Sequence, residues 1–400
     1  MRGIFLCRKM HAACIKKGVT NRGMDNQKDA IGDDTPFARP MDPVDDPECH
    51  MVRTMFATAK RQWLQTTEYV VVGGAGMHGL MYIGVLMGLC NHDRDTYVAW
   101  SSRVKGLAGA SAGALVSFMM ACGLDPWQMR REIVLCDLGR VVDHVSQTSM
   151  EDMRKMGALT SGKAADDATR ELVFRLCGCT ETTFRALQAR TGRTFIVTVS
   201  NADTGRTEYW SHWTKPDMPV WLALRCSSSV PVIFNAHSVH GNSIYDGGIS
   251  CNIPCHLFPS HATLTLFSFM NYKTTSAMPM PTPTPTPTSV PTPTQPPSTS
   301  KLAEISTLAK MTWMNQQLGP MRAVPMYAVR SVPCIAAGNA VSAYTYNATQ
   351  SEIDVLICSG LASLHGVLLR NLLIAIVYAL TVATARWRVL GATKRLQRTA

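Results

Sequence analysis

The chain has 400 residues, of which 46% are hydrophobic and 17% charged, with a formal net charge of +11. This apolar content supports a sizeable core in one large or two ordinary domains and excludes a wholly disordered protein. The charge is modest for the length. The sequence contains no recognised nucleic-acid-binding module and no basic stripe interleaved with aromatic residues, so a nucleic-acid partner is not expected.

The cysteines and the N-terminal segment indicate the compartment. The 13 cysteines are odd in number, and Cys177/Cys179 and Cys251/Cys255 lack histidines at metal-ligand spacing. We therefore expect reduced thiols in an intracellular protein, without a metal. Residues 1–17 have no sustained apolar core, so no signal peptide is expected. Residues 1–62 mix charges with acidic turns and are expected to form a poorly ordered N-terminal extension.

A first strand–turn–helix unit is predicted at residues 69–86. Residues 69–72 (YVVV) favour a strand, 73–79 (GGAGMHG) a glycine-rich turn and 80–86 (LMYIGVL) a helix. Such a turn offers unpaired N–H groups to an anion, which would be either a nucleotide phosphate or an oxyanion. No Lys-Ser/Thr follows the glycines, and no acidic residue closes a second strand at the usual distance, so the oxyanion is favoured.

A second unit surrounds the pentapeptide 109–113 (GASAG), between the apolar runs 104–108 (VKGLA) and 114–121 (ALVSFMMA). A G-x-S-x-G between strand and helix is typical of a nucleophile elbow, whose small flanking residues present the serine hydroxyl. The helix would also point its free N–H groups and positive dipole end at Ser111. By itself the pattern is equally compatible with a tight turn.

The following segments continue the alternation of helices and strands that is typical of an α/β domain. Residues 125–127 (DPW) are expected to open a helix, and residues 137–190 to be mainly helical. Residues 203–206 (DTGR) predict a hairpin turn, and residues 237–244 a hairpin turning at Gly241-Asn242. Asp246-Gly247-Gly248 follows directly. Alone it would be a turn, but beside a serine nucleophile Asp246 becomes a candidate base.

Taken in order, residues 74–79, Gly109-x-Ser111-x-Gly113 and Asp246-Gly247-Gly248 resemble the patatin-like phospholipases. Residues 193–211 and 223–234 resemble other segments of that family, and the likeness covers roughly residues 66–272. It implies a three-layer α/β/α sandwich with a central, mostly parallel sheet. It also implies phospholipase A-type lipid acyl hydrolysis through an acyl-enzyme, with no cofactor.

The resemblance assigns the site residue by residue. Ser111 would be the nucleophile and Asp246 the general base of a Ser-Asp dyad. The oxyanion hole would be Gly74, Ala75 and Gly76, and the further motif glycines are Gly79, Gly109, Gly113, Gly247 and Gly248. Two positions depart from the family pattern. Ala75 replaces the middle one of three glycines, and His78 stands where the family has a basic residue. Alanine can still donate its N–H where the turn does not require a positive φ.

From residue 66 onward the chain divides into four parts. Residues 66–275 are expected to form the core of the catalytic domain, with 262–269 (ATLTLFSF) as a core strand. Residues 276–300 hold Pro-Thr repeats, which forbid helix and ladder pairing and predict a disordered loop. Residues 301–366 would complete the catalytic domain, and residues 367–400 would form an apolar helix with a basic tail.

Residues 367–385 (VLLRNLLIAIVYALTVATA) approach the length of a membrane span, although Arg370 and Asn371 interrupt them. A buried closing helix, an interfacial helix and a C-terminal transmembrane anchor all remain open. The basic tail that follows can add about 1 kcal/mol per charge near anionic lipid. We therefore expect a lipid substrate and association with a membrane or lipid-droplet surface. The sequence assigns no oligomeric state.

Two other functions remain open. An α/β-hydrolase esterase would use a Ser-Asp-His triad, for which His256, His261 and His365 are available. Alternatively, the altered glycine loop is compatible with an inactive membrane-bound scaffold that kept the fold.

Overall fold

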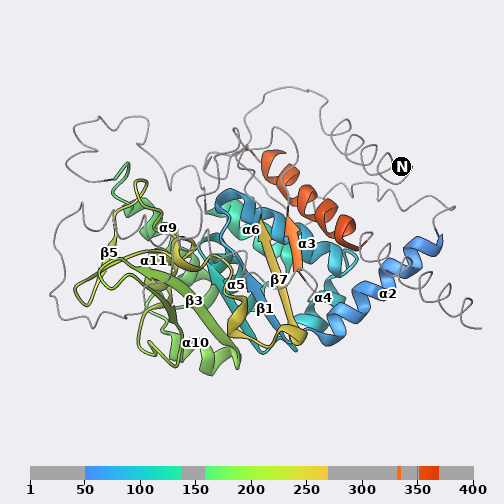
Figure 1. Cartoon of the computed structure of the whole chain (residues 1–400), viewed down its shortest axis with the longest axis horizontal. Coiled ribbons are helices and arrows are strands. Elements are labelled where there is room, and N and C mark those ends of the chain that lie inside the picture. The colour runs from blue at the N-terminus through green and yellow to red at the C-terminus, as the bar shows by residue number, and fades with distance from the viewer. Residues whose placement is uncertain (1–49, 137–157, 269–330, 335–348, 350, 369–400) are drawn as a thin grey trace, which may run out of the picture.

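The computed structural model describes residues 50–136, 158–268, 331–334, 349 and 351–368. Within these ranges the chain forms an 8-stranded sheet with strand order β5-β6-β3-β2-β1-β7-β8, and β4 pairs with β3 (Figure 1). The strands are β1 Tyr69–Val72, β2 Gly106–Ala110, β3 Thr194–Asn201, β4 Arg206–Trp210, β5 His237–Val239, β6 Asn242–Asp246, β7 Thr263–Ser268 and β8 Ser331–Cys334.

The centre of the sheet is parallel and one end is antiparallel. Strands β3, β2, β1, β7 and β8 run parallel to their neighbours in that order. The hairpins β3–β4 and β5–β6 and the pair β3–β6 are antiparallel. Parallel strands need crossover connections, and the chain supplies helices for them. The helices are α2 His50–Thr66, α3 Leu80–Leu89, α4 Arg94–Ser101, α5 Ala112–Ala121, α6 Pro126–Leu135, α9 Lys163–Cys177, α10 Phe184–Thr191, α11 Val220–Ser227 and α12 Gly248–Cys251.

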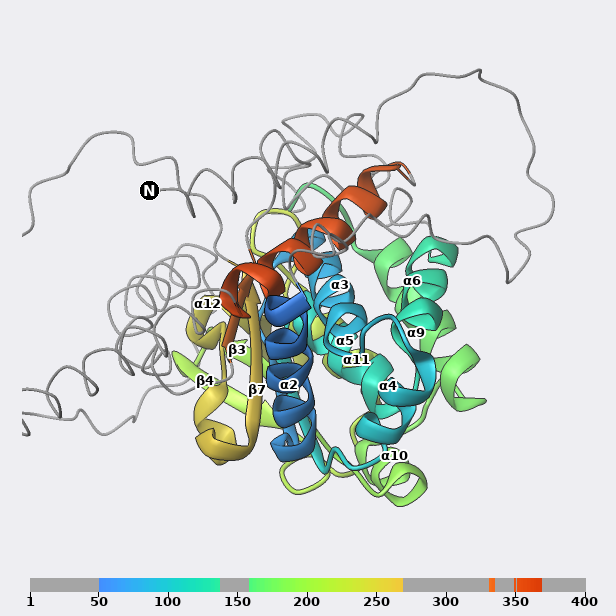
Figure 2. The same ribbon diagram turned by 90° about the vertical axis from the view of Figure 1, so that its right-hand side faces the viewer.

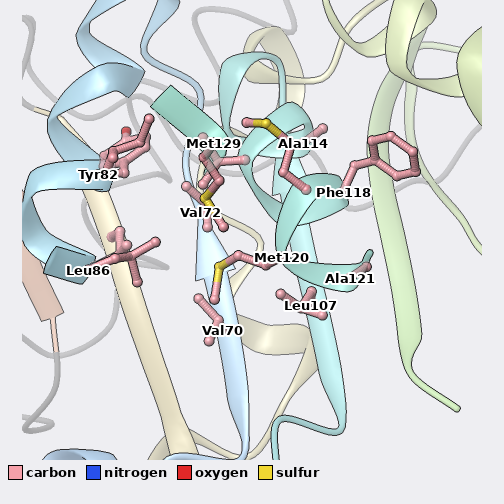
Figure 3. Packing of buried hydrophobic residues seen from close by; sticks show 14 of the residues in the cluster. Val70, Val72, Tyr82, Leu86, Leu107, Ala114, Phe118, Met120, Ala121 and Met129 are labelled. Carbon is pink, nitrogen blue, oxygen red and sulfur yellow. The ribbon is translucent and has the colours of Figure 1, made fainter. Parts of the chain in front are cut away.

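The two faces of the sheet are covered unequally. On β1, Val70 and Val72 belong to the large cluster packed under helices, whereas Val71 faces the other side with Ala108 and Ile196. Figure 3 shows the first face, where Val70, Val72 and Leu107 lie beneath the side chains of α3 and α5. Figure 2 shows these helices gathered on one side of the strands. The mixed α/β class with a mostly parallel central sheet is therefore confirmed.

Both predicted hairpins are present, one with a shifted turn. Residues 202–205 connect β3 to β4, and Arg206, the last residue of the predicted turn, already pairs with Asn201. In the second hairpin Asn242 already pairs with Val239, so the turn is formed by His240 and Gly241 and not by Gly241-Asn242. Both turn residues have positive φ, 50° and 81°. The tightest hairpin turn requires this at both central positions, which fixes the turn one residue earlier.

The predicted helix opening at residues 125–127 is confirmed. Asp125 and Gln128 form a capping box in front of α6, and Pro126 occupies the first turn. The strand predicted at 262–269 is β7. The helices expected within residues 137–190 are α9 and α10 in the part that the structure describes.

Residues 50–62 correct the expectation of a poorly ordered extension up to residue 62. They form most of α2, which buries Phe56, Trp63 and Leu64. Residues at this spacing lie on one face of a helix, and that face contributes to the core. The acidic turns before residue 50 were therefore not representative of the whole segment. Residues 1–49 lie outside the described part of the chain.

The helix formed by residues 351–368 packs against α3 through glycines. A Cβ on Gly84 of α3 would lie 1.8 Å from the carbonyl oxygen of Ile357, and one on Gly360 equally close to that of Met81. Across from α3, His365 stacks on Phe56 of α2 with 6.0 Å between ring centroids. Figure 2 shows this helix, in red, crossing beside α2 and α3. The glycines thus allow two backbones to touch.

This helix, Ser351–Leu368, is also the one described element long and apolar enough to span a membrane, although 50% of it is buried inside the protein. The helix predicted at 367–385 lies outside the described residues after Leu368. The Pro-Thr loop at 276–300 and the basic tail lie outside them as well.

Candidate active site

Ser111 occupies a strained turn between β2 and α5. Its backbone has φ 53° and ψ −129°, a region that non-glycine residues rarely adopt. The turn closes so tightly that a Cβ on Gly109 would lie 2.5 Å from the carbonyl of Gly113, and one on Gly113 2.2 Å from the oxygen of Val72. The predicted strand, turn and helix are therefore present. Strain of this kind is concentrated at functional sites.

The register of the sheet brings Asp246 to Ser111. Strand β3 pairs Thr198 with Ala110, the residue before Ser111, and pairs Val199 with Asp246. Consecutive residues of one strand therefore hold the nucleophile turn and the aspartate. The Ser111 hydroxyl is thereby placed beside the Asp246 carboxyl, close enough for a side-chain hydrogen bond to lower the pKa of that carboxyl. The two predicted residues thus meet, although 134 other residues separate them in the chain.

Burial sets the ionisation of Asp246. The residue is only 5% exposed, and burial raises the pKa of its carboxyl to about 6. A hydrogen bond from the Ser111 side chain, one from the Gly248 backbone N–H and the charge of Arg225 all lower this pKa. The Gly248 N–H donates to Oδ1 at 2.6 Å. Near neutral pH the carboxyl is ionised and can accept a proton.

Ser227 joins the nucleophile turn to β3. Its buried Oγ accepts a hydrogen bond from the Ser111 N–H at 2.8 Å and donates one to the Thr198 carbonyl at 2.7 Å. Its own carbonyl accepts the N–H of Gly247 at 3.4 Å. One residue at the end of α11 therefore contacts both the serine turn and the Asp-Gly-Gly turn. Sequence reasoning noted the surrounding segment but not this role, which only the tertiary contact reveals.

The remaining motif glycines permit close approach. A Cβ on Gly247 would lie 2.1 Å from the Thr198 oxygen, and one on Gly79 would lie 3.0 Å from the Cβ of Ala112. The Asp-Gly-Gly turn therefore packs directly on β3, and the first glycine turn packs on the start of α5.

The glycine turn after β1 lies beside Ser111 and is held by Asn252. A Cβ on Gly74 would be 3.1 Å from the Ser111 Cβ. The Asn252 side chain donates to the Gly74 carbonyl at 3.1 Å, and the Gly74 N–H donates to the Asn252 carbonyl at 3.3 Å. Of the three predicted oxyanion donors, Gly74 is thus engaged, which leaves the amides of Ala75 and Gly76. Asn252 was not identified from the sequence.

The backbone explains why alanine is accepted at position 75. Ala75 has φ −154°, whereas Gly76 has φ 53°. Only Gly76 adopts the left-handed conformation that favours glycine. The replacement of the middle glycine therefore leaves the path of the turn intact.

A cavity of about 160 Å³ opens beside Ser111. Its walls are mainly apolar side chains of α5, α6 and α9, together with Gly76 and the Ser111 turn. The apolar lining residues include Leu115, Val116, Met119, Ile133, Ala165, Ala168 and Leu172. Glu132, a polar lining residue, is neutralised by Arg175 at 2.9 Å. The cavity therefore suits a hydrocarbon chain better than a polar ligand.

Arg225 forms part of the same wall, and it too was not identified as functional from the sequence. It is 2% exposed, binds Asp166 with 2.7 Å between Nε and Oδ1, and lies over the Phe234 ring. Buried charges need such pairing, because an unpaired one is costly. Its positive charge stabilises the ionised form of Asp246.

Two of the three histidines considered for a triad pack against other aromatic rings. His365 stacks on Phe56, and His256 packs edge-on against Tyr209 with 5.3 Å between ring centroids. His261 lies in a short 3-10 turn before β7. The titratable group that the Ser111 hydroxyl influences is the carboxyl of Asp246.

The part of the chain that contains this site is similar to known proteins. Residues 70–259 match the family model described as Patatin-like phospholipase. The chain is 24% identical over 186 residues to "Probable lipid hydrolase 463L" of Invertebrate iridescent virus 6, covering 46% of this chain and 61% of that protein. It is 22% identical over 217 residues to "Uncharacterized protein R571" of Acanthamoeba polyphaga mimivirus, covering 54% and 70%. The chain thus spans less than two thirds of the first of these relatives.

Two solved structures also align with this chain. VipD from Legionella pneumophila aligns at 13% identity and a TM-score of 0.44, over 76% of this chain and 67% of VipD. The type III effector ExoU, from Pseudomonas aeruginosa, aligns at 14% identity and a TM-score of 0.37, over 76% of this chain and 53% of ExoU. The family match includes both turns and the Asp-Gly-Gly motif. Residues 70–259 therefore form a domain of the patatin-like phospholipase family.

Proposed function

We propose that this protein is a lipid acyl hydrolase that cleaves carboxylic esters of membrane lipids with Ser111 as nucleophile and Asp246 as general base. The observation that carries the proposal is the placement of the Ser111 hydroxyl beside the buried carboxyl of Asp246, next to an apolar cavity. A weak nucleophile needs a base within reach, and Asp246 meets that requirement without a histidine.

In the first half of the reaction, Ser111 Oγ attacks the ester carbonyl and its proton passes to Asp246. The amides of Ala75 and Gly76 stabilise the oxyanion, and they are the members of the predicted loop not engaged by Asn252. The alcohol part of the lipid then leaves with the proton held by Asp246. The acyl group remains on Ser111 as an ester.

In the second half, Asp246 takes a proton from water, which attacks the acyl-enzyme and releases a fatty acid. The proton on Asp246 returns to Ser111 Oγ, and the enzyme is regenerated. The N-terminus of α5 points toward the same place, and its dipole favours the developing negative charge.

The cavity supports a lipid as substrate class. Its apolar lining would bind an acyl chain, and each buried methylene contributes about 0.8 kcal/mol. The printed names of the matched family and of the iridescent-virus protein, a phospholipase and a lipid hydrolase, point to the same class.

We also propose that the protein works within the cell at a membrane or lipid-droplet surface. The sequence supports this with the apolar run 372–385 and with the basic tail of Arg386, Arg388, Lys394, Arg395 and Arg398. Such a tail would favour anionic lipid headgroups. For helix Ser351–Leu368 we propose a structural role instead, because its backbone packs directly on α3.

A fluorophosphonate probe tests the catalytic assignment. We expect it to label the wild type and the Ser102→Ala variant, which alters an exposed serine after α4, but not Ser111→Ala. Thermal melting of Ser111→Ala controls for folding. Labelling that persists in this variant would overturn the role of Ser111.

Product analysis separates the alternatives. We expect fatty acid release from phospholipid, and full activity in His256→Gln, His261→Gln and His365→Gln. Loss of activity in one folded histidine variant would favour a triad. No release from phospholipid, lysophospholipid or triglyceride by folded wild type would instead indicate an inactive scaffold.

A further inference from the structure

Two thiols meet at the far ends of α5 and α9. Cys122 directly follows α5 and Cys177 is the last residue of α9. Their Sγ atoms lie 4.0 Å apart, and both residues are partly accessible free thiols. A disulfide requires the two sulfurs to approach to about 2 Å, so the sulfurs must move toward each other by about 2 Å.

An arginine of α10 is fixed between these thiols. Arg190 Nη2 donates to Cys177 Sγ at 3.1 Å and to Cys122 Sγ at 3.6 Å. Its Nη1 is anchored on the Leu176 carbonyl at 3.1 Å. The positive charge therefore lies closer to Cys177. A guanidinium beside a thiol favours the thiolate, which is the reactive form.

The ionisation of the pair follows the same order. A hydrogen bond from Cys122 and the charge of Arg190 hold the pKa of Cys177 below its ordinary value, in opposition to burial. The hydrogen bond to Cys177 and burial raise the pKa of Cys122. One sulfur is thus disposed to be the nucleophile, and the other to be a protonated thiol beside it.

Cys136 provides a contrast within the described chain. Arg175 Nη2 lies 3.5 Å from its Sγ, but this guanidinium also binds Glu132 and Glu171. Burial raises the pKa of the Cys136 thiol. An arginine neighbour alone therefore does not make a reactive cysteine, and Cys136 is a matched control.

We propose that Cys177 and Cys122 are a modification site that hydroperoxides oxidise to a disulfide. The Cys177 thiolate attacks the terminal peroxide oxygen and the O–O bond breaks. Hydroxide leaves from hydrogen peroxide, or alkoxide from an organic hydroperoxide, and takes up the proton that the Cys177 thiol had released to solvent. Cys177 is then a sulfenic acid. Cys122 sulfur attacks the Cys177 sulfur, its proton goes to the departing hydroxyl, and water and the disulfide result. The sulfurs lose two electrons and the peroxide gains them.

The disulfide would join two walls of the cavity. Met119 lies one turn of α5 before Cys122, Leu172 lies on α9 before Cys177, and both line the cavity. The bond closes a loop that also contains α6, which forms another wall. It would therefore restrict separation of these helices. The chemistry of the thiols does not depend on the lipid hydrolase assignment.

Peptide mapping of the reduced full chain tests the pair. After hydrogen peroxide treatment and alkylation, we expect a peptide linking Cys122 to Cys177 with the mass loss of two hydrogens. The link should persist in Cys136→Ser and vanish in Cys122→Ser, where Cys177 should instead carry a sulfenic acid trapped by dimedone. A link between Cys177 and the exposed Cys179, or no oxidation at either thiol, would overturn the proposal.

The arginine is tested by alkylation rate. Arg190→Gln should slow the reaction of iodoacetamide with Cys177 on the order of tenfold at neutral pH. Arg185→Gln, which removes an exposed arginine of the same helix paired with Asp217, should leave the rate unchanged. Equal rates in the wild type and Arg190→Gln would contradict the role of Arg190. Matching thermal melts show that the variants are folded.

Discussion

The two glycine-rich turns of this protein both connect a central strand to a helix, but their glycines serve different purposes. In the turn around Ser111, positions 109 and 113 require glycine for steric reasons, because neighbouring backbone atoms occupy the positions that a side chain would take. In the turn after β1, Gly76 supplies a positive φ and Ala75 accepts a side chain without strain. The first kind of requirement is steric and absolute. The second is conformational and costs less to change.

The largest expected effect is therefore at Gly113. In Gly113→Ala the new methyl would lie 2.2 Å from the Val72 oxygen and 2.5 Å from that of Gly73, both backbone atoms in the sheet centre. We expect a loss of more than about 3 kcal/mol in the free energy of unfolding, or no folded protein. Urea denaturation measures it. Near-wild-type stability would show that the turn can widen, which would contradict the steric requirement for glycine at position 113.

Asp246→Asn should separate catalysis from stability. We expect activity to fall at least about a thousandfold, because the amide cannot accept the Ser111 proton. The native pKa is raised from 3.8 to about 6, so ionised Asp246 costs stability above that pH, and the cost vanishes below the lower value. Removing the charge should stabilise the protein at neutral pH by about 1–3 kcal/mol. Lower stability with retained activity would contradict both the role of Asp246 as general base and the cost that its buried charge imposes on stability.

The pH profile should report the same group. Asp246 acts when deprotonated, so kcat/KM should rise about tenfold per pH unit below about 6 and level off above it. Hydrolysis of a soluble ester measures the profile. Since Arg225 lowers this pKa, Arg225→Gln should move the midpoint upward, provided that thermal melting shows a folded variant. A profile that stays flat from about one pH unit below the midpoint to about one unit above it would exclude Asp246 as the base.

The smallest effect is expected in the first turn. Gly76→Ala places a side chain at φ 53° and should cost about 1–2 kcal/mol in stability. Ala75→Gly should change stability by no more than about 1 kcal/mol, through the entropy of the unfolded chain. Thermal melts of both variants test the pair. A larger loss of stability in Ala75→Gly than in Gly76→Ala would contradict the inference that position 76 requires glycine and position 75 does not.

Local patterns predicted most of the fold because each strand and turn carries its own signal. Val70–Val72, the capping residue Asp125 and the turn at 203–206 specify their structure through nearby residues. Ser111 and Asp246 could be paired only through the ordered motifs, since their contact depends on the register of β3 with two other strands. Ser227 and Asn252 carry no local signal, because a single serine or asparagine acquires its role from a distant backbone partner. The helical character of residues 50–62 was obscured by the acidic turns that precede it.

The glycine contact between α3 and residues 351–368 has a practical consequence for protein production. Removal of the apolar and basic C-terminal residues is an obvious way to improve solubility. A truncation placed before residue 351 would expose Gly84 and Gly88 and the apolar surface of α3 around them. Exposed apolar surface of this kind promotes aggregation. A stop codon after Leu368 would keep this surface of α3 covered and would remove only the segment that follows.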